Sequence, residues 1–112
     1  MKKVNIAEKL SLFKEYWRPR IVGELNDQYV KVAKVKGEFI RHKHDKEDEL
    51  FLILKGSLEI KLRKQNVILN EGEFFIVPRG VEHKTVAKEE THILLFEPKT
   101  TLITGSTTSE VI

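Results

Sequence analysis

Short apolar segments of strand length recur along most of this chain, and many of the breaks between them contain glycine or proline. The stretch 57–63 is the clearest segment, because Leu58, Ile60 and Leu62 alternate with charged residues. Strict alternation of this kind is typical of a strand with one buried face. Strands at spacings of roughly 8 to 12 residues predict an all-β sandwich or barrel. The expected strands are 20–25, 29–35, 39–44, 49–54, 57–63, 67–69, 74–77, 84–87 and 91–97, with a turn at 88–90 between the last two.

The first residues follow a different pattern. Asn5 can cap a helix, and Glu8 stands three residues later, which is the spacing of a capping box. Leu10 and Phe13 continue an apolar stripe, so the helix is expected to reach about Tyr16, before Pro19 stops it. The predicted organisation is a helical segment at 1–19, a barrel at 20–99 and a Thr/Ser-rich tail at 100–112. The tail is either disordered or packed along a neighbouring chain, and the sequence does not decide between these.

Composition narrows the classes of function. The chain has 112 residues, a net charge of +3 and no cysteine, which removes disulfides, thiolate metal sites and cysteine nucleophiles. Basic residues are interleaved with acidic ones, so nucleic-acid binding is not expected. Neither a signal peptide nor the roughly 20 apolar residues of a membrane helix is present, and we expect a cytoplasmic protein without a membrane partner.

The histidines supply the strongest chemical signal. His42 and His44 are two apart on an extended segment, so both side chains face the same way. Glu49 begins the next strand, and His83 follows a Pro-x-Gly turn much later. Each of these residues alone would more often be structural or solvated. Together, three imidazoles and one carboxylate suit one divalent transition metal ion: Fe, Mn, Ni, Co, Cu or Zn. His92 is expected to be structural or at the surface, with a supporting role near the metal as the alternative.

The spacing around these residues is specific. Residues 37–56 read glycine, His-x-His, four residues, glutamate, six residues, glycine. Residues 72–83 read glycine, five residues, Pro-x-Gly, two residues, histidine. The two segments resemble the two motifs of the cupin superfamily. The resemblance implies a jelly-roll barrel in which the first motif supplies three metal ligands and the second supplies one. Two departures are visible: Gly37 is one residue nearer to His42 than usual, and Ala87 replaces a frequent asparagine.

This resemblance does not fix a reaction, because such barrels host many functions. We expect a divalent-metal-dependent enzyme, oxygenase-like or isomerase-like, that acts on a small molecule in the barrel. The alternative is a non-catalytic module that binds or senses a metal or a small molecule. Phe51 and Ile53 share the strand face of Glu49 and are candidate pocket walls, together with Phe74 and Phe75. An apolar lining favours an oxygenase or a hydrophobic ligand over a phosphosugar.

A phosphosugar would need a cation near the barrel mouth. Arg41 and Lys43 flank the histidines, but strand alternation turns both away from the metal. Arg79 on the Pro-x-Gly turn is a better candidate, although a solvated turn residue is the more usual role.

Two segments, 50–54 and 93–96, are apolar on both strand faces. One face can point into the barrel, and the other then needs a cover. The N-terminal helix can supply part of that cover and a second subunit the rest. We therefore predict a homodimer.

Overall fold

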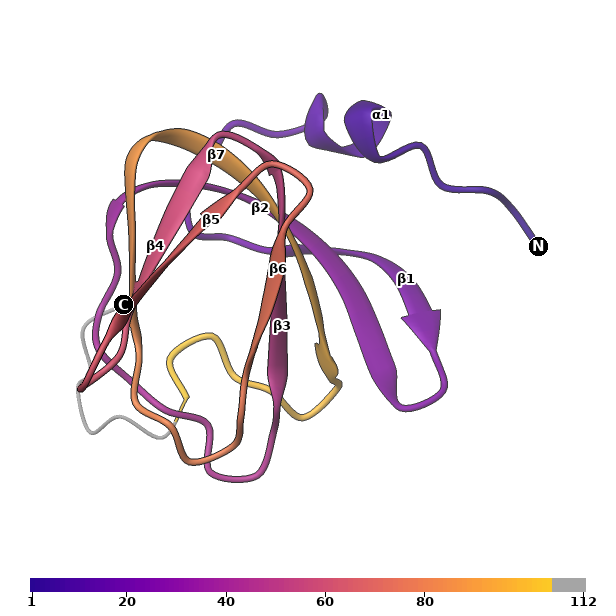
Figure 1. Cartoon of the computed structure of the whole chain (residues 1–112). Coiled ribbons are helices and arrows are strands. Elements are labelled where there is room, and N and C mark those ends of the chain that lie inside the picture. The colour runs from indigo at the N-terminus through magenta and orange to yellow at the C-terminus, as the bar shows by residue number, and fades with distance from the viewer. Residues whose placement is uncertain (106–112) are drawn as a thin grey trace.

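The computed structural model describes residues 1–105, and a long strand, β7 (Lys84–Pro98), organises the fold (Figure 1). The preceding elements are the helix α1 (Ile6–Leu10) and the strands β1 (Arg20–Leu25), β2 (Gln28–Glu38), β3 (Glu49–Lys55), β4 (Ser57–Lys61), β5 (Asn66–Asn70) and β6 (Phe74–Val77). Of the predicted tail, residues 106–112 lie outside the described part of the chain.

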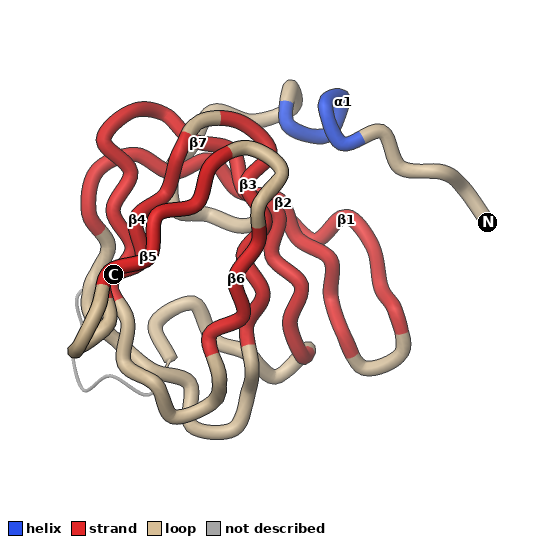
Figure 2. The backbone as a smooth tube through the Cα atoms, viewed as in Figure 1, coloured by secondary structure: helices blue, strands red, loops and turns tan. Residues whose placement is uncertain are grey.

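All pairings between the named strands are antiparallel. The main order is β1-β2-β7-β3-β6, while β4 pairs with β5 and with the first part of β7. The second part of β7 pairs with β3, so one strand belongs to both walls. Figure 2 shows these strands curving around a common interior. The predicted all-β jelly-roll barrel with a short N-terminal helix is confirmed.

The predicted turn at 88–90 is wrong, because β7 runs through it without interruption. Val35 lies opposite Thr91 and Gly37 lies opposite Ala87, so three residues of β7 face Lys36 alone. This irregularity is a bulge, which bends a strand without ending it. The charged residues 88–90 are exposed on the bulge, and for that reason they resemble a turn in the sequence.

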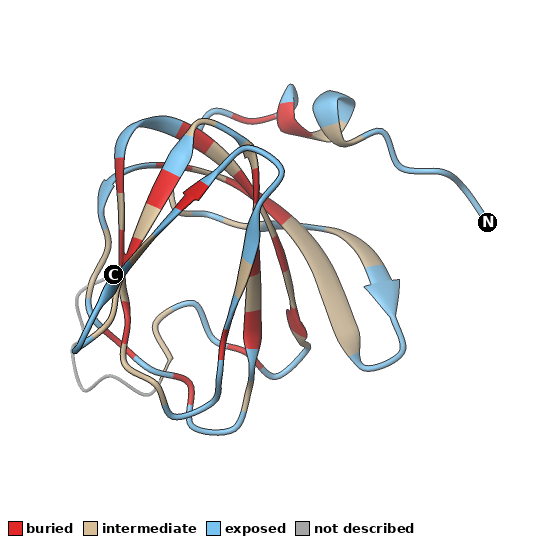
Figure 3. Cartoon of the chain, in the orientation of Figure 1, coloured by how far each residue is buried: buried red, intermediate tan, exposed pale blue. Residues whose placement is uncertain are grey.

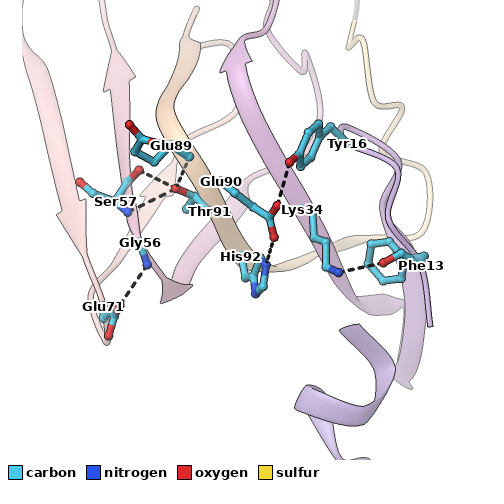
Figure 4. A network of polar contacts seen from close by, with 10 residues as sticks. All are labelled: Phe13, Tyr16, Lys34, Gly56, Ser57, Glu71, Glu89, Glu90, Thr91 and His92. Carbon is cyan, nitrogen blue, oxygen red and sulfur yellow. Dashed lines mark hydrogen bonds and ion pairs between the residues drawn. The ribbon is translucent and has the colours of Figure 1, made fainter. Parts of the chain in front are cut away.

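Polar contacts hold the bulge in place (Figure 4). The hydroxyl of Thr91 lies 3.0 Å from the Ser57 carbonyl oxygen and 3.1 Å from that of Glu89, and donates to both. The carboxylate of Glu90 accepts from the Tyr16 hydroxyl at 2.7 Å and lies 2.8 Å from the Nε2 atom of His92. These bonds connect the bulge to β4 and to the segment before β1.

Helix α1 is shorter than predicted. The Asn5 side chain caps it by accepting from the Glu8 amide at 3.0 Å, as expected, but the helix ends at Leu10 and not near Tyr16. Beyond α1 the chain extends along β2, where Tyr16 forms a bridge with Lys34. Beyond Val32, β1 no longer pairs with β2, and this edge of β2 is open to the segment before β1. The Trp17 amide donates to the Lys34 carbonyl oxygen there, which replaces the hydrogen bonds of a longer helix. The short α1 is far from long enough to span a membrane, and residues 1–105 contain no longer helix.

Two groups of apolar side chains are buried (Figure 3). The larger group fills the barrel and includes Phe51, Ile53, Leu58 and Ile60. The smaller group lies outside the barrel wall: Leu10 and Phe13 from the N-terminal segment, against Val32 of β2, with Ile6, Val22 and Leu54 around them. The N-terminal segment thus covers one part of the outer sheet face.

Candidate metal centre

The two sequence motifs meet at one end of the barrel. His42 and His44 lie in the loop between β2 and β3, Glu49 is the first residue of β3, and His83 directly precedes β7. The backbones of His42 and His83 form a β-bridge, with amide-to-carbonyl distances of 3.0 and 2.9 Å. The amide of Gly80 donates to the His44 carbonyl oxygen at 2.7 Å. Backbone hydrogen bonds therefore place the three histidines together before any metal is considered.

The four side chains offer donor atoms that all lie within 4.8 Å of one another. The Nε2 atoms of His44 and His83 lie 3.3 and 3.4 Å from Oε1 of Glu49. All four residues are buried, and within residues 1–105 these three atoms lack a hydrogen-bond partner. Buried polar atoms without partners are costly, so convergent ones fit a missing cation. The residues predicted as ligands thus form a cluster that can hold a divalent ion.

Backbone carbonyls orient two of the rings. Nδ1 of His42 lies 2.9 Å from the Ile40 carbonyl oxygen, and Nδ1 of His83 lies 3.0 Å from that of Val81. Each Nδ1–H donates to its carbonyl, which leaves Nε2 unprotonated and available. Contacts of this kind fix the tautomer of a metal-binding histidine.

Burial also sets the charge of the cluster. Burial lowers the pKa of His42 to about 4, so its ring is neutral near neutral pH. Burial alone would raise the pKa of Glu49, but the rings of His44 and His83, 3.3 and 3.4 Å from its Oε1 atom, outweigh that effect and hold the pKa well below its usual range. Neutral imidazole and ionised carboxylate are the forms that bind a metal ion.

The comparisons agree with this geometry. The family model of the cupin domain matches residues 29–97. This chain is a cupin. It is 34% identical over 79 residues to YdbB of Bacillus subtilis, an uncharacterized protein, and the match covers 70% of each chain. The crystal structure of a cupin-2 domain protein from Shewanella frigidimarina has 46% identity and a TM-score of 0.85, over 86% of this chain and 94% of that one. A Neisseria meningitidis protein of known structure, 23% identical, shares the fold with a TM-score of 0.80, over 88% of this chain and 100% of that one.

A second buried carboxylate adjoins the centre of this cupin, and sequence reasoning missed it. Glu97, near the end of β7, is 3% exposed and lies 3.0 Å from the ammonium of Lys31. Burial and the neighbouring Glu49 raise the pKa of Glu97 to about 8. One signal was available: Glu97 shares the inward strand parity of Ile93 and Leu95.

A pocket opens beside the candidate metal ligands of the cupin. Its polar lining consists of His42, Glu49 and Thr85. Its larger apolar and aromatic side chains are Trp17, Phe39, Phe51, Ile93, Leu95 and Ile103. Within residues 1–105, no lysine or arginine lines this pocket. Trp17, Phe39 and Ile103 were not predicted as wall residues, since nothing local in the sequence shows that they meet.

Of the four residues predicted as pocket walls, one lines the pocket. Phe51 lines the pocket, whereas Ile53 is buried in the core and is not part of the lining. The expectation for Phe74 was wrong: it lies opposite Leu52 on the outer face and is 60% exposed. Phe75 faces inward but packs against the core outside the pocket. The edge strand β6 therefore contributes no wall.

Other polar candidates lie away from the centre. His92 is half-buried beside Glu90, as expected for a structural or surface residue. The Arg79 side chain contacts the Asp48 carboxylate at 3.4 Å and does not line the pocket. Among residues 1–105, the pocket lining thus offers no lysine or arginine for a phosphate.

Proposed function

We propose that this cupin is a divalent-metal-dependent enzyme that acts on a small molecule bound in the barrel. The observation that carries the proposal is the buried group of four donor residues beside an apolar pocket, three of which hold a donor atom without a hydrogen-bond partner. His42, His44, Glu49 and His83 would hold the ion. When bound, such an ion supplies a Lewis acid for a substrate oxygen or a binding position for dioxygen.

The chain's own residues define what the site can do. Glu49 brings a negative charge against the ion, and the neutral histidines keep the total charge low. Phe51, Ile93 and Leu95 exclude water from the interior side of the pocket. An apolar lining that excludes water strengthens each electrostatic interaction at the metal centre. This apolar lining supports an oxygenase reaction more than the isomerisation of a phosphosugar.

Metal content is the first test. Untagged full-length protein, purified without chelators, should contain about one divalent ion per chain by elemental mass spectrometry. Iron would direct the search toward oxygen uptake with small-molecule substrates, and manganese, nickel, cobalt, copper or zinc would keep non-redox reactions in view. Failure to bind any of these ions after reconstitution would overturn the proposed metal centre. Metal binding with no turnover on any substrate would favour a non-catalytic sensing module.

We also propose that this cupin forms a homodimer through the outer face of β6, β3 and β7. Registered pairs place two adjacent apolar rows across these strands: Ile76, Leu50 and Phe96 in one, and Phe74, Leu52 and Leu94 in the other. The N-terminal segment covers the neighbouring surface around Val32, but Phe74 and Ile76 stay 60% and 47% exposed. Contiguous exposed apolar surface of this kind usually marks an interface, and a second copy offers the same apolar chemistry.

A further inference from the structure

The stacked aromatic pair Trp17 and Phe39 forms an aromatic wall of the pocket close to the proposed metal ligands. Their ring centroids lie 5.0 Å apart at an interplanar angle of 21°, which is a stacked arrangement. Phe39 in turn meets the ring of His42 edge-on, with centroids 5.5 Å apart. The aromatic surface therefore begins one ring away from a predicted ligand. Both Trp17 and Phe39 are half-buried, so part of each ring remains accessible.

We propose that this wall selects a ligand with a metal-binding oxygen group at one end and a flat apolar group, such as an aromatic ring, at the other. The proposal rests on the proposed metal centre and adds the substrate class. The oxygen group would face the ion held by His42, His44, Glu49 and His83. The flat group would lie against Trp17 and Phe39.

Trp17 is held in place at both ends. Its backbone amide donates to the Lys34 carbonyl oxygen at 2.9 Å, and its indole Nε1–H donates to that of Lys36 at 3.0 Å. Its φ of 63° lies in the left-handed region, which is unfavourable for a bulky residue. The indole N–H is already used, so the ring presents apolar surface to a ligand. A wall fixed in advance lowers the ordering cost of binding.

Phe39 lies inside the part of the chain that the family model matches, but the rest of the wall comes from outside it. That model spans residues 29–97, whereas Trp17 and Pro19 precede it and Ile103 follows it. The barrel supplies the metal donors and the interior surface. The segments on either side of the barrel supply much of the wall at the pocket mouth, where they can select between ligands.

Charge argues against the other main substrate class. Only a group at the ion itself would have a positive charge beside it, and a phosphate or sulfate on the rest of the ligand would meet no lysine or arginine among the described residues that line the pocket. Burying an unpaired anion is strongly unfavourable. Arg79, which lies within the second motif, is paired with the Asp48 carboxylate. The ligand's body is accordingly neutral and apolar.

Two hydroxamates with the same metal-binding head group test this inference. Benzohydroxamate carries a phenyl ring and acetohydroxamate a methyl group, and each is titrated into the Zn²⁺-loaded full-length protein by calorimetry. Benzohydroxamate should bind roughly 10-fold or more tightly, because a phenyl ring buries far more apolar surface. Trp17 is the chain's single tryptophan, so its fluorescence should change with benzohydroxamate in parallel.

Variants of the wall residues show which side chains cause the preference for benzohydroxamate. Trp17→Ala and Phe39→Leu should remove most of the benzohydroxamate advantage and leave acetohydroxamate affinity within about 3-fold. Trp17→Phe keeps a ring and should retain part of the advantage, which also covers the case in which the alanine variant does not fold. Phe74→Ala, on the outer face, should change neither affinity.

The outcomes separate the two proposals. Equal affinities for both hydroxamates on protein that retains one Zn²⁺ per chain would overturn the aromatic-ligand inference alone. An advantage that persists in Trp17→Phe and Phe39→Leu at full strength would overturn it too. Protein that takes up no Zn²⁺ would overturn the metal centre, and this inference with it.

Discussion

The imidazoles of His42 and His83 come together because their backbones form a reciprocal β-bridge, at 3.0 and 2.9 Å. The ring centroids lie 4.4 Å apart as a result. The side chains contribute nothing to the bridge, so each can be replaced while the backbone pairing remains. This separates metal binding from folding in experiments on the site.

We therefore expect His42→Ala and His83→Ala to remain folded and to lose metal affinity. Replacing a residue that only supports a ligand lowers metal affinity by roughly 10- to 100-fold, so replacing a ligand itself should lower metal affinity by more than about 100-fold. Elemental analysis after dialysis measures the loss, and circular dichroism checks the fold. His92→Ala is the matched control, because His92 lies with Glu90 away from the cluster. Stoichiometric metal in both ligand variants would refute the assignment.

Metal should also stabilise the protein. The unpaired atoms of His44, Glu49 and His83 are buried together only in the folded state, so an ion that binds them favours that state. At an ion concentration of 100 times Kd, the gain is about 2.7 kcal/mol. For a domain of this size that corresponds to a rise in Tm of roughly 10 °C. Thermal scans with and without a chelator measure it, and Tm values that coincide would contradict the prediction.

Stability without metal should depend on Glu97. Its pKa of about 8 in the folded state exceeds the ordinary glutamate value of 4.5, so the folded protein holds a proton that the unfolded chain releases. Its stabilising contribution is complete below pH 4.5 and is lost as the pH rises through 8. Between pH 6 and 8 this contribution should fall by about 2 kcal/mol.

Glu97→Gln has no proton to lose, so this fall should disappear in chelator-treated protein. Urea unfolding at several pH values provides the comparison. His42 acts in the opposite direction at lower pH: its depressed pKa makes a contribution that is present above 6.5 and is lost as the pH falls through about 4. Parallel pH profiles for wild type and Glu97→Gln between pH 6 and 8 would show that Glu97 does not carry the effect.

Gly56 in the β3–β4 connection and Gly72 in the β5–β6 connection provide a paired test of backbone strain and side-chain contact. Both have positive φ, 90° and 82°, but a Cβ at Gly56 would lie 2.7 Å from Oγ1 of Thr91, whereas Gly72 faces open space. Gly72→Ala should cost about 1 kcal/mol for backbone strain alone. Gly56→Ala should cost about 2–3 kcal/mol, because it also displaces the Thr91 network. Chemical denaturation distinguishes the two, and equal losses would mean that the contact is relieved without cost.

The proposed dimer can be broken from its outer face. Phe74→Lys or Ile76→Lys places a charge in one of the two apolar rows and should yield a monomer in sedimentation velocity at micromolar concentration. Ile68→Lys changes an equally apolar residue, 63% exposed on β5 and away from that face, and should leave the assembly intact. A wild-type protein that sediments as a monomer would remove the basis of the proposal.

The sequence allowed the barrel and the metal cluster to be predicted, because alternation and motif spacing are local signals. Leu58, Ile60 and Leu62 reveal a strand by themselves, and His42 and His44 reveal a shared face. The sequence predicts a turn at 88–90 where the structure has a bulge, because charged, exposed residues are typical of both. Trp17 and Ile103 were missed because only the folded chain brings two distant segments to one pocket mouth.

The pairing of β2 with β7 joins segments far apart in the chain, with Gln28 opposite Pro98. Pairings of such long range make folding slow, since the intervening loop must close before they gain any contacts. The predicted metal ligands all lie in that loop, with His42 just after β2 and His83 just before β7, so the centre forms only once the loop has closed. An ion that binds the finished site acts after the transition state, and such interactions slow unfolding without speeding folding. Metal loss would therefore shorten the lifetime of the native protein and leave its rate of folding unchanged.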